Sequence, residues 1–184
     1  LEHTSAASTP ACPPPMTITS YLSTIKKIKL GLANFKGVQR RFNKIFSYKD
    51  IDFYDDYAHH PTEIKFVLEG VNKVYNDYEK VCVFQPHRIS RLRDLRKEFS
   101  FSFQNADMVI LCPVYLAGEK IRLGFSYLKF AKEIIKNSKV RLFLIKDNIQ
   151  LAKFVKKNIY GKKIVIGMGA GTISNWMREL PKLM

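Results

Sequence analysis

The sequence predicts an α/β fold, a doubly wound and mainly parallel sheet with helices on both of its faces. From residue 46 onward, apolar runs of strand length alternate five times with segments whose apolar residues recur at helical spacing. Most of these runs are apolar throughout and lack the alternation of a half-exposed strand. Such strands are typical of a parallel sheet that is covered on both faces.

Five short segments are predicted to form the strands. Each is largely apolar and has a length that suits a buried strand. They are IDFY (51–54), VCVFQ (81–85), DMVILCP (107–113), VRLFLI (140–145) and KIVIGMG (163–169).

Helices are predicted after each of these strands. Pro61 and Thr62 favour a helix start, because proline is tolerated in the first helical turn. Ser90 is expected to cap a short helix and Thr172 to cap the last one, since hydroxyl oxygens accept hydrogen bonds from free N–H groups. The apolar positions that define the helices are Ile64, Val67, Leu68, Val71 and Tyr75, then Leu92, Leu95 and Phe99, then Tyr127, Leu128, Ala131, Ile134 and Ile135, then Leu151, Phe154 and Val155, and finally Ile173, Trp176 and Leu180.

The first part of the chain has a different composition. Residues 1–16 are rich in Pro, Ser, Thr and Ala and do not begin with Met, so we expect a disordered or expression-derived lead. From Thr17 to Leu32 apolar residues recur at helical spacing, with lysines on the other face, and the helix is expected to end at Gly37. We therefore expect a lead at 1–16, a connecting segment at 17–45 and a folded domain at 46–184.

The composition suits one globular domain, with or without an appendage. The 184 residues are 46% hydrophobic and 26% charged, enough for a core without disulfides or metals. Cys82 and Cys112 lie in apolar runs and are expected to be buried free thiols. With Cys12 they show neither disulfide nor zinc spacing, which fits a reducing, cytoplasmic location. No apolar stretch reaches the length of a membrane span.

The net charge of +15 and the pI near 9.8 first suggest a polyanionic partner such as nucleic acid. The lysines, however, occur in scattered pairs and are not interleaved with aromatic residues as in nucleic-acid-binding modules. We therefore expect lysine-rich exposed helix faces, no membrane partner and no specific nucleic-acid partner.

Polar residues concentrate directly after four of the predicted strands, in DDYAHHP, QPHRISR, PVYLAGE and GMGAGT. In open α/β sheets, ligands bind outside the carboxyl ends of the strands. The sequence therefore predicts a polar cleft at one edge of the sheet.

The cluster Asp55, Asp56, His59 and His60 allows three interpretations. A metal site is one, but neither CxxC nor HExxH spacing supports it. A solvated turn is another, since such residues are common in turns. The third is a ligand site, in which Asp accepts from a ribose hydroxyl and His donates to a carboxylate.

Two further motifs also have plain alternatives. Arg88 and Arg91, three apart at a predicted helix start, are expected to bind a carboxylate or phosphate together with the free N–H groups of that helix, or are surface arginines of a cationic protein. The GMGAGT segment only weakly resembles a dinucleotide fingerprint, because no acidic residue follows about 20 positions later, and a tight turn is favoured. No GxxxxGK[ST] sequence and no Ser/His/Asp or Cys/His arrangement stands out.

Five motifs together resemble the Mur ligases, and within that family the branch that joins L-alanine to UDP-N-acetylmuramate. They are LANFKGVQRRF, DDYAHHPTEI, VFQPHRISRLRDL, ADMVILCPVYLAGE and IGMGAGTIS. Family members have a UDP-sugar domain, a central ATPase domain with a GTHGKT-type loop and a Rossmann-like third domain that brings the amino acid. The resemblance covers the third domain, and residues 17–45 are similar to the tail of the second.

The resemblance implies an ATP-dependent ligase of peptidoglycan biosynthesis with L-alanine, ATP and UDP-N-acetylmuramate as partners, and with ATP and Mg2+ bound mainly by the central domain. The amino group of L-alanine would attack an acyl phosphate formed on the lactyl carboxylate. Arg41 near the phosphates and Asp56 near the ribose would contact ATP. Contacts with L-alanine are implied for Tyr57, His59, His87, Arg88 and Arg91.

The chain carries no P-loop, so we expect it to be inactive alone. The alternative is a standalone basic α/β module that binds an anionic small molecule or a polyanion through Arg88, Arg91 and its basic surface.

Overall fold

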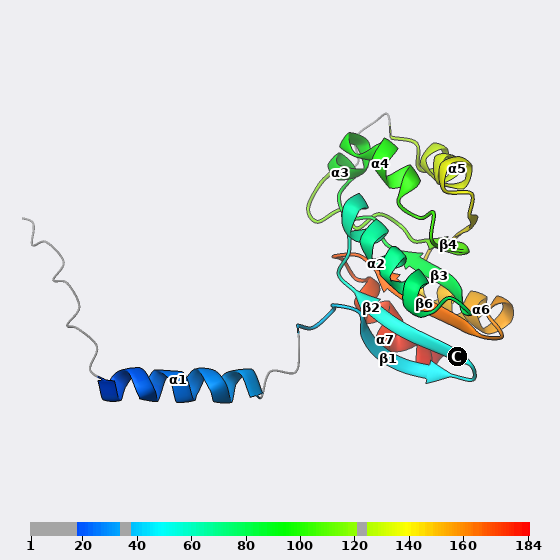
Figure 1. Cartoon of the computed structure of the whole chain (residues 1–184). Coiled ribbons are helices and arrows are strands. Elements are labelled where there is room, and N and C mark those ends of the chain that lie inside the picture. Colours follow the sequence, from blue (N-terminus) through cyan, green and yellow to red (C-terminus); the bar gives the residue numbers. More distant parts are fainter. Residues whose placement is uncertain (1–17, 34–37, 121–124) are drawn as a thin grey trace, which may run out of the picture. The chain divides into compact units, whose positions relative to one another are not determined.

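A computed structural model describes residues 18–33, 38–120 and 125–184, which belong to two compact units, Leu1–Gly37 and Val38–Met184 (Figure 1). In the first unit, α1 spans Ile18–Ala33, which confirms the helix expected from Thr17 to Leu32. No helix in the described ranges combines the length and the apolar character needed to cross a bilayer.

The second unit is built on a six-stranded sheet with the strand order β1-β2-β6-β3-β4-β5. β1 is antiparallel to β2, and all other neighbours are parallel. The strands are β1 (Asn43–Tyr48), β2 (Ile51–Asp56), β3 (Glu79–Phe84), β4 (Met108–Leu111), β5 (Arg141–Leu144) and β6 (Lys163–Met168). The mainly parallel sheet and all five expected strands are confirmed.

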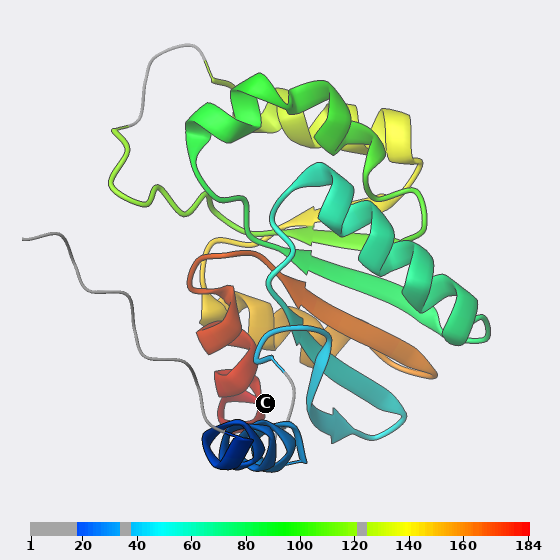
Figure 2. The same ribbon diagram turned by 60° about the vertical axis from the view of Figure 1, so that its left-hand side comes forward.

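Helices cover both faces of the sheet, which confirms the doubly wound arrangement (Figures 1 and 2). On one face lie α2 (Pro61–Val74), α3 (Ile89–Asp94), α4 (Arg96–Phe101) and α5 (Tyr127–Ser138). On the other face lie α6 (Asn148–Asn158) and α7 (Ile173–Leu183).

Successive residues of the central strand β3 point into two different cores. Cys82 and Phe84 belong to the core under α2, α4 and α5, whereas Val81 and Val83 belong to the core under α6 and α7. All four side chains are fully buried, and burying a side chain such as Phe84 stabilises the fold by about 1.5–3 kcal/mol. Burial on both sides fixes the register of β3 and with it the position of the loop that follows.

The strand β1 was not expected, and the predicted domain boundary at residue 46 falls inside it. β1 is an edge strand whose residues are at most half-buried, so its sequence, NKIFSY, lacks the apolar run that marks the other strands. Phe46 nevertheless stacks on Phe53 of β2, with ring centroids 4.2 Å apart, and Lys44 forms an ion pair with Asp52. These contacts attach β1 to the sheet, and the compact unit begins at Val38.

Two of the predicted elements are only partly buried. β5 is the other edge strand, and Phe143 and Leu144 are each 40% exposed, so this strand is not covered on both faces. Leu128 and Ile135 of α5 are also exposed, because the buried face of α5 is formed by Phe130 together with Ala131 and Ile134.

The short helix expected after Ser90 has a different start and a break. It consists of α3 and α4, which are separated at Leu95. Arg88 occupies the N-cap position of α3, and the Ser90 hydroxyl donates to Glu119 instead of capping the helix. The predicted Ser90 cap is therefore wrong, because a carboxylate from a distant loop takes that hydroxyl.

Candidate functional site

The carboxyl ends of β2, β3, β4 and β6 meet at one edge of the sheet, and the segments that follow them are hydrogen-bonded to one another. The Gly169 N–H donates to the carbonyl of Asp56 at 3.3 Å and joins the ends of β6 and β2. The Arg88 N–H donates to the carbonyl of Tyr115 at 2.9 Å and joins the loops after β3 and β4. The polar motifs therefore share one edge, as the sequence predicts.

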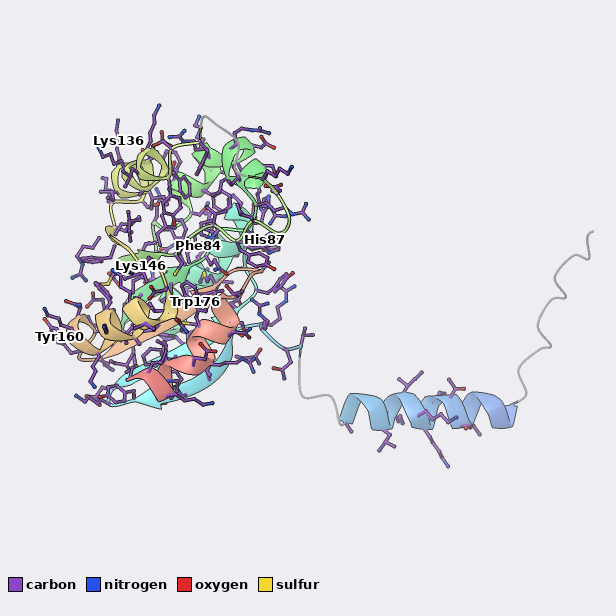
Figure 3. All side chains as sticks on the ribbon, turned by 180° about the vertical axis from the view of Figure 1, so that it is seen from behind. Phe84, His87, Lys136, Lys146, Tyr160 and Trp176 are labelled. Carbon is purple, nitrogen blue, oxygen red and sulfur yellow. The ribbon has the colours of Figure 1, made fainter. Side chains whose placement is uncertain are left out.

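A row of aromatic and imidazole rings runs along this edge, where Figure 3 shows His87. Ring centroids are 5.1 Å apart for Tyr57 and His59, 5.7 Å for His59 and His87, and 5.6 Å for His87 and Tyr115. The guanidinium of Arg40 lies 4.7 Å from the centroid of the Tyr57 ring, within the range of a cation–π contact. The fold thus brings the rings of Tyr57, His59 and His87 together, each in contact with the next.

Two arginines lie beside His87. Arg91 Nη1 is 3.3 Å from His87 Nδ1. Arg88 is exposed, has no hydrogen-bond or ion-pair partner for its side chain among the described residues, and has a φ of +68°, an uncommon and strained conformation. Burial lowers the pKa of His87, and the charges of Arg91, His59 and Arg88 lower it further. His87 is therefore neutral at neutral pH beside two guanidiniums.

In the first turn of α3, the polar groups of Ser90 are already hydrogen-bonded within the chain. The Ser90 N–H and hydroxyl both donate to the carboxylate of Glu119, at 3.1 and 2.5 Å. This corrects the expectation that free N–H groups of the helix join the arginines in an anion receptor. An anion at this position would depend on the side chains of Arg88 and Arg91.

Asp56 ties down the loop after β2. It is 3% exposed, and its carboxylate oxygens accept hydrogen bonds from the N–H groups of Phe42 at 2.8 Å and Ala58 at 2.7 Å. Burial raises the pKa of Asp56, and these two hydrogen bonds oppose that rise without cancelling it. The Asp56 carboxylate therefore holds the backbone of this loop in place.

Arg40, which the sequence did not single out, is bound more closely to this edge than Arg41. The Arg40 guanidinium donates to the carbonyl of Gly169, and its Nε lies 3.7 Å from the fully buried Asp55. Arg41 is exposed, with its guanidinium 6.0 Å from the centroid of the Tyr57 ring. Arg40 and Arg41 are adjacent in QRRF, and nothing in the sequence around them distinguishes their roles. Because Arg40 has internal partners, Arg41 is the one whose charge remains open to a ligand.

His60 is the N-cap residue of α2 and does not join the row of rings. Its Nδ1 accepts from the Thr62 N–H at 3.3 Å, and Glu63 Oε2 accepts from the N–H groups of His60 at 3.2 Å and His59 at 2.9 Å. This is a capping box. Glu63 was missed in the sequence, although HPTE places a glutamate three positions after the cap, which is the spacing of that motif.

The GMGAGT segment forms the tight turn from β6 to α7 that was expected. Gln85 Oε1 accepts from the Ile173 N–H at 3.0 Å, and Gln85 Nε2 donates to the Thr172 hydroxyl at 3.0 Å. Thr172 holds the N-cap position, but its hydroxyl contacts Gln85 and not the helix N–H groups. Gly169 has a φ of +147°, and a Cβ there would lie 2.6 Å from the Gln85 carbonyl oxygen. Close backbone approach therefore explains this glycine.

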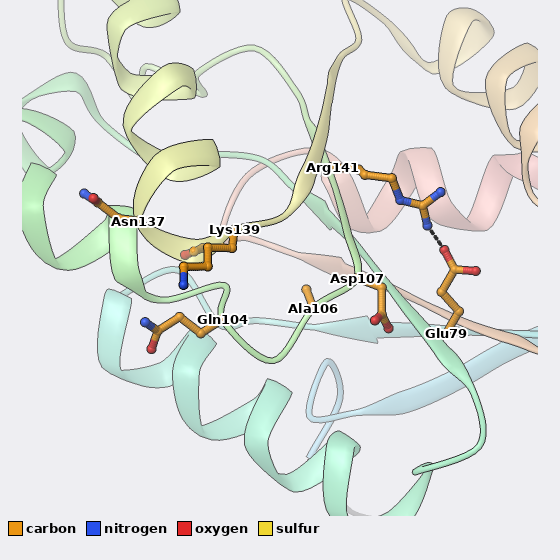
Figure 4. Close-up of a pocket in the computed structure, with 8 residues that line it drawn as sticks. Glu79, Gln104, Ala106, Asp107, Asn137, Lys139 and Arg141 are labelled. Atoms are coloured by element: carbon orange, nitrogen blue, oxygen red, sulfur yellow. Dashed lines mark hydrogen bonds and ion pairs between the residues drawn. The ribbon is translucent and has the colours of Figure 1, made fainter.

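Two cavities have walls that include none of Tyr57, His59, His87, Arg88 and Arg91, although Ile89, Pro113, Val114 and Leu116 of the QPHRISR and PVYLAGE motifs line the second. A cavity of about 790 Å³ opens at the opposite edge of the sheet, with the ion pair of Glu79 and Arg141 on one side and Gln104 and Lys139 on the other (Figure 4). A second, of about 630 Å³, has largely apolar walls formed by the loops after β4 and β5. Within the described ranges, no group of three or more His, Cys, Asp or Glu side chains is placed to hold a metal ion.

The fold and this edge define a class of protein: a doubly wound α/β domain whose strand ends carry arginines beside imidazole and phenol rings. The family model described as "Mur ligase, glutamate ligase domain" matches residues 40–171. The chain belongs to the Mur ligase family, which confirms the resemblance seen in its motifs.

Named relatives narrow the comparison. The UDP-N-acetylmuramate–L-alanine ligase of Pelagibacter ubique is 69% identical over 157 residues, which cover 85% of this chain and 34% of that protein. The same ligase of Bartonella bacilliformis is 39% identical over 155 residues, 84% of this chain and 32% of that protein. A UDP-N-acetylmuramate–alanine ligase structure from Thermotoga maritima has the same fold, with a TM-score of 0.63 at 24% identity, covering 89% of this chain and 35% of that one. The chain thus spans about a third of the length of the curated relatives it matches.

Proposed function

We propose that this chain is the C-terminal, amino-acid-delivering domain of a UDP-N-acetylmuramate–L-alanine ligase, an ATP-dependent enzyme of peptidoglycan biosynthesis. The observation that supports this most is the row of Tyr57, His59 and His87, flanked by Arg88 and Arg91, at the carboxyl edge of the sheet. That edge is where open α/β sheets bind their ligands. The 69% identity to a ligase of that name supports the same assignment.

In the proposed reaction, ATP phosphorylates the lactyl carboxylate of UDP-N-acetylmuramate, and the amino group of L-alanine attacks the resulting acyl phosphate. Arg88 and Arg91 hold the carboxylate of L-alanine, since guanidinium–carboxylate hydrogen bonds are strong and directional. Tyr57, His59 and His87 line the space next to it. Holding the amine beside the acyl phosphate is catalysis by positioning.

On the nucleotide side, Arg41 is exposed and suits the phosphates of ATP. Both oxygens of Asp56 already accept backbone hydrogen bonds. Its role near the ribose is therefore to fix the loop that would lie next to the nucleotide. The carboxylates of Glu63 and Glu119 are likewise bonded to backbone N–H groups. We therefore assign the Mg2+ that accompanies ATP to parts of the ligase outside this chain.

The same proposal covers the rest of the chain. Residues 17–45 contain α1 and the start of the second unit, and we assign them to the tail of the ATPase domain and the connection to this one. Cys82 and Cys112 are free and buried, which suits the reducing cytoplasm where such a ligase would act.

The test is a comparison of arginine variants in the full-length ligase that contains this chain. Loss of one charge-assisted hydrogen bond costs about 1.5–3 kcal/mol, so Arg88→Ala and Arg91→Ala should each raise the KM for L-alanine about 10- to 100-fold. The KM for UDP-N-acetylmuramate should not change. Arg93→Ala is the matched control, because Arg93 is an exposed arginine of the same helix that pairs with Asp94.

Two results would contradict the proposal. An unchanged KM for L-alanine in both Arg88→Ala and Arg91→Ala would remove the carboxylate site from this edge. Turnover of ATP, UDP-N-acetylmuramate and L-alanine by the 184-residue chain alone would show that it is not one domain of a larger ligase.

A further inference from the structure

The ring nitrogens of His59 and His87 have partners that fix opposite tautomers. His59 Nδ1 lies 3.0 Å from the Tyr57 carbonyl oxygen and 3.3 Å from Glu63 Oε2. Both oxygens are acceptors, so Nδ1 carries the proton and Nε2 keeps its lone pair. His87 Nδ1 lies 3.3 Å from Arg91 Nη1, which can only donate, so the proton of His87 is on Nε2.

The two neighbouring rings therefore present one acceptor and one donor. The acceptor is His59 Nε2 and the donor is the Nε2–H of His87, and neither atom has a hydrogen-bond partner among the described residues. An amino acid needs this combination, because its carboxylate accepts hydrogen bonds and its ammonium group must lose a proton before it becomes a nucleophile. With the carboxylate held at Arg88 and Arg91, on the His87 side, the ammonium group falls on the His59 side.

Glu63 is placed to orient the His59 ring, as carboxylates orient histidine bases in other enzymes. Its Oε2 accepts from the N–H groups of His59 and His60 in the first turn of α2, where the helix dipole favours negative charge. Burial alone would raise the pKa of Glu63, but these hydrogen bonds and the charges of His59 and Arg41 lower it below its ordinary value. Glu63 is therefore ionised at neutral pH, next to the ring that would become positive.

The groups that face His59 come from three segments. Glu63 belongs to α2, Tyr57 to the loop after β2, and His87 to the loop after β3. Among the residues that the structure describes, Glu63 is the charged side chain paired with the His59 ring, and the neighbouring His87 is neutral at neutral pH. This arrangement of a base with an orienting group matches that of activated catalytic dyads.

We propose that His59 is the catalytic base that takes a proton from the ammonium group of the incoming amino acid, and that Glu63 positions it; the inference rests on the proposed function. An ammonium N–H bond breaks, its electron pair stays on nitrogen, and the proton bonds to His59 Nε2. The amine then forms a C–N bond to the carbonyl carbon of the acyl phosphate. The bond between that carbon and the bridging oxygen of the phosphate group breaks. The departing phosphate takes the second amine proton and leaves as hydrogen phosphate.

The deciding experiment uses the full-length ligase with two nucleophiles. Hydroxylamine is uncharged at neutral pH and attacks acyl phosphates without a base, whereas L-alanine arrives as an ammonium ion. His59→Gln should lower the rate with L-alanine about 10²- to 10⁴-fold, the usual contribution of a general base. Hydroxamate formation from hydroxylamine should stay within a few-fold of the wild-type rate, which also shows that the variant is folded.

His60→Asn is the control, because asparagine keeps the N-cap of α2, and it should match the wild type with both nucleophiles. An L-alanine rate that survives in His59→Gln, or equal losses with both nucleophiles, would overturn the role of His59. If instead the wild-type ligase does not join L-alanine to UDP-N-acetylmuramate at all, the proposed function fails, and the two failures are distinguishable.

Glu63→Gln tests the positioning residue with the same two nucleophiles. Glutamine keeps an oxygen that can accept the backbone N–H groups of His59 and His60, so the helix start is preserved while the negative charge beside the ring is lost. The rate with L-alanine should fall while hydroxamate formation stays near the wild-type rate, and equal losses with both nucleophiles would mean that Glu63 only holds the helix.

The tautomers can be read directly on the 184-residue chain. Imidazole nitrogen-15 NMR at neutral pH should show the His59 proton on Nδ1 and the His87 proton on Nε2. A His59 proton on Nε2 would overturn the proposal, because that nitrogen would have no lone pair for the ammonium group.

Discussion

Replacement of Gly169 by alanine should destabilise the domain, because the turn between β6 and α7 has no room for a Cβ atom. The φ of Gly169 is +147°, and strained conformations of this kind cost an L-residue about 1–3 kcal/mol. The new Cβ would lie 2.6 Å from the Gln85 carbonyl oxygen and 3.2 Å from the Ile173 side chain. Forcing extra atoms into a packed region costs about 1–3 kcal/mol more, so the free energy of unfolding should fall by about 2–6 kcal/mol.

Gly70→Ala is the matched control, because Gly70 lies inside α2 and a Cβ there meets no atom within 4 Å. It should gain about 0.5–1 kcal/mol, since alanine is the better residue in a helix interior. Urea denaturation followed by circular dichroism measures both variants. A Gly169→Ala variant as stable as the wild type would refute this account of the turn, as would a Gly70→Ala variant that is equally destabilised.

Two further predictions concern Asp56 and His87. Asp56→Ala leaves the part-buried N–H of Phe42 and the buried N–H of Ala58 without their acceptor and should cost about 2–6 kcal/mol in urea denaturation. An unchanged midpoint would contradict the role of Asp56 in the loop. Because the pKa of His87 is lowered in the folded state, the unfolded chain binds more protons as pH falls below the ordinary histidine value, so the wild type should lose stability from about pH 7 to 5. His87→Gln should show a flatter pH dependence over that range, and equal slopes would count against the burial of His87.

The fold was predictable because burial leaves a direct pattern in the sequence. Residues of β3 enter two cores, so the strand is apolar at every position and easy to find. The edge strands show the limit of that signal. β1 was missed because its side chains are at most half-buried. β5 was found, but its sequence did not reveal that Phe143 and Leu144 are exposed, because both are apolar.

The position of the candidate site was predictable from the motifs, whereas the contacts of its residues with partners far along the chain were not. Tyr57, His59 and His87 were named from the sequence, and the fold brings their rings together. Arg40 and Glu119 were missed. Arg40 donates to the carbonyl of Gly169 and Glu119 accepts from Ser90, which only the folded sheet places beside them. Long-range contacts of this kind leave no local spacing to read.

A hydrogen bond also decides between neighbours of the same type. His59 and His60 are adjacent and chemically identical in sequence, yet one joins the row of rings and the other caps α2. Glu63 serves both, because it accepts from the backbone N–H of each residue. The two histidines therefore have different roles because the start of α2 points their side chains in different directions.

The central claim is that the amino acid is held and activated at the carboxyl edge of this sheet. A crystal structure of the full-length ligase with the product UDP-N-acetylmuramoyl-L-alanine tests it most directly. We predict the alanyl carboxylate within about 3 Å of a guanidinium nitrogen of Arg88 or Arg91, with the new amide nitrogen on the His59 side of the row of rings. An alanyl group bound elsewhere, with Arg88 and Arg91 in solvent, would contradict the account.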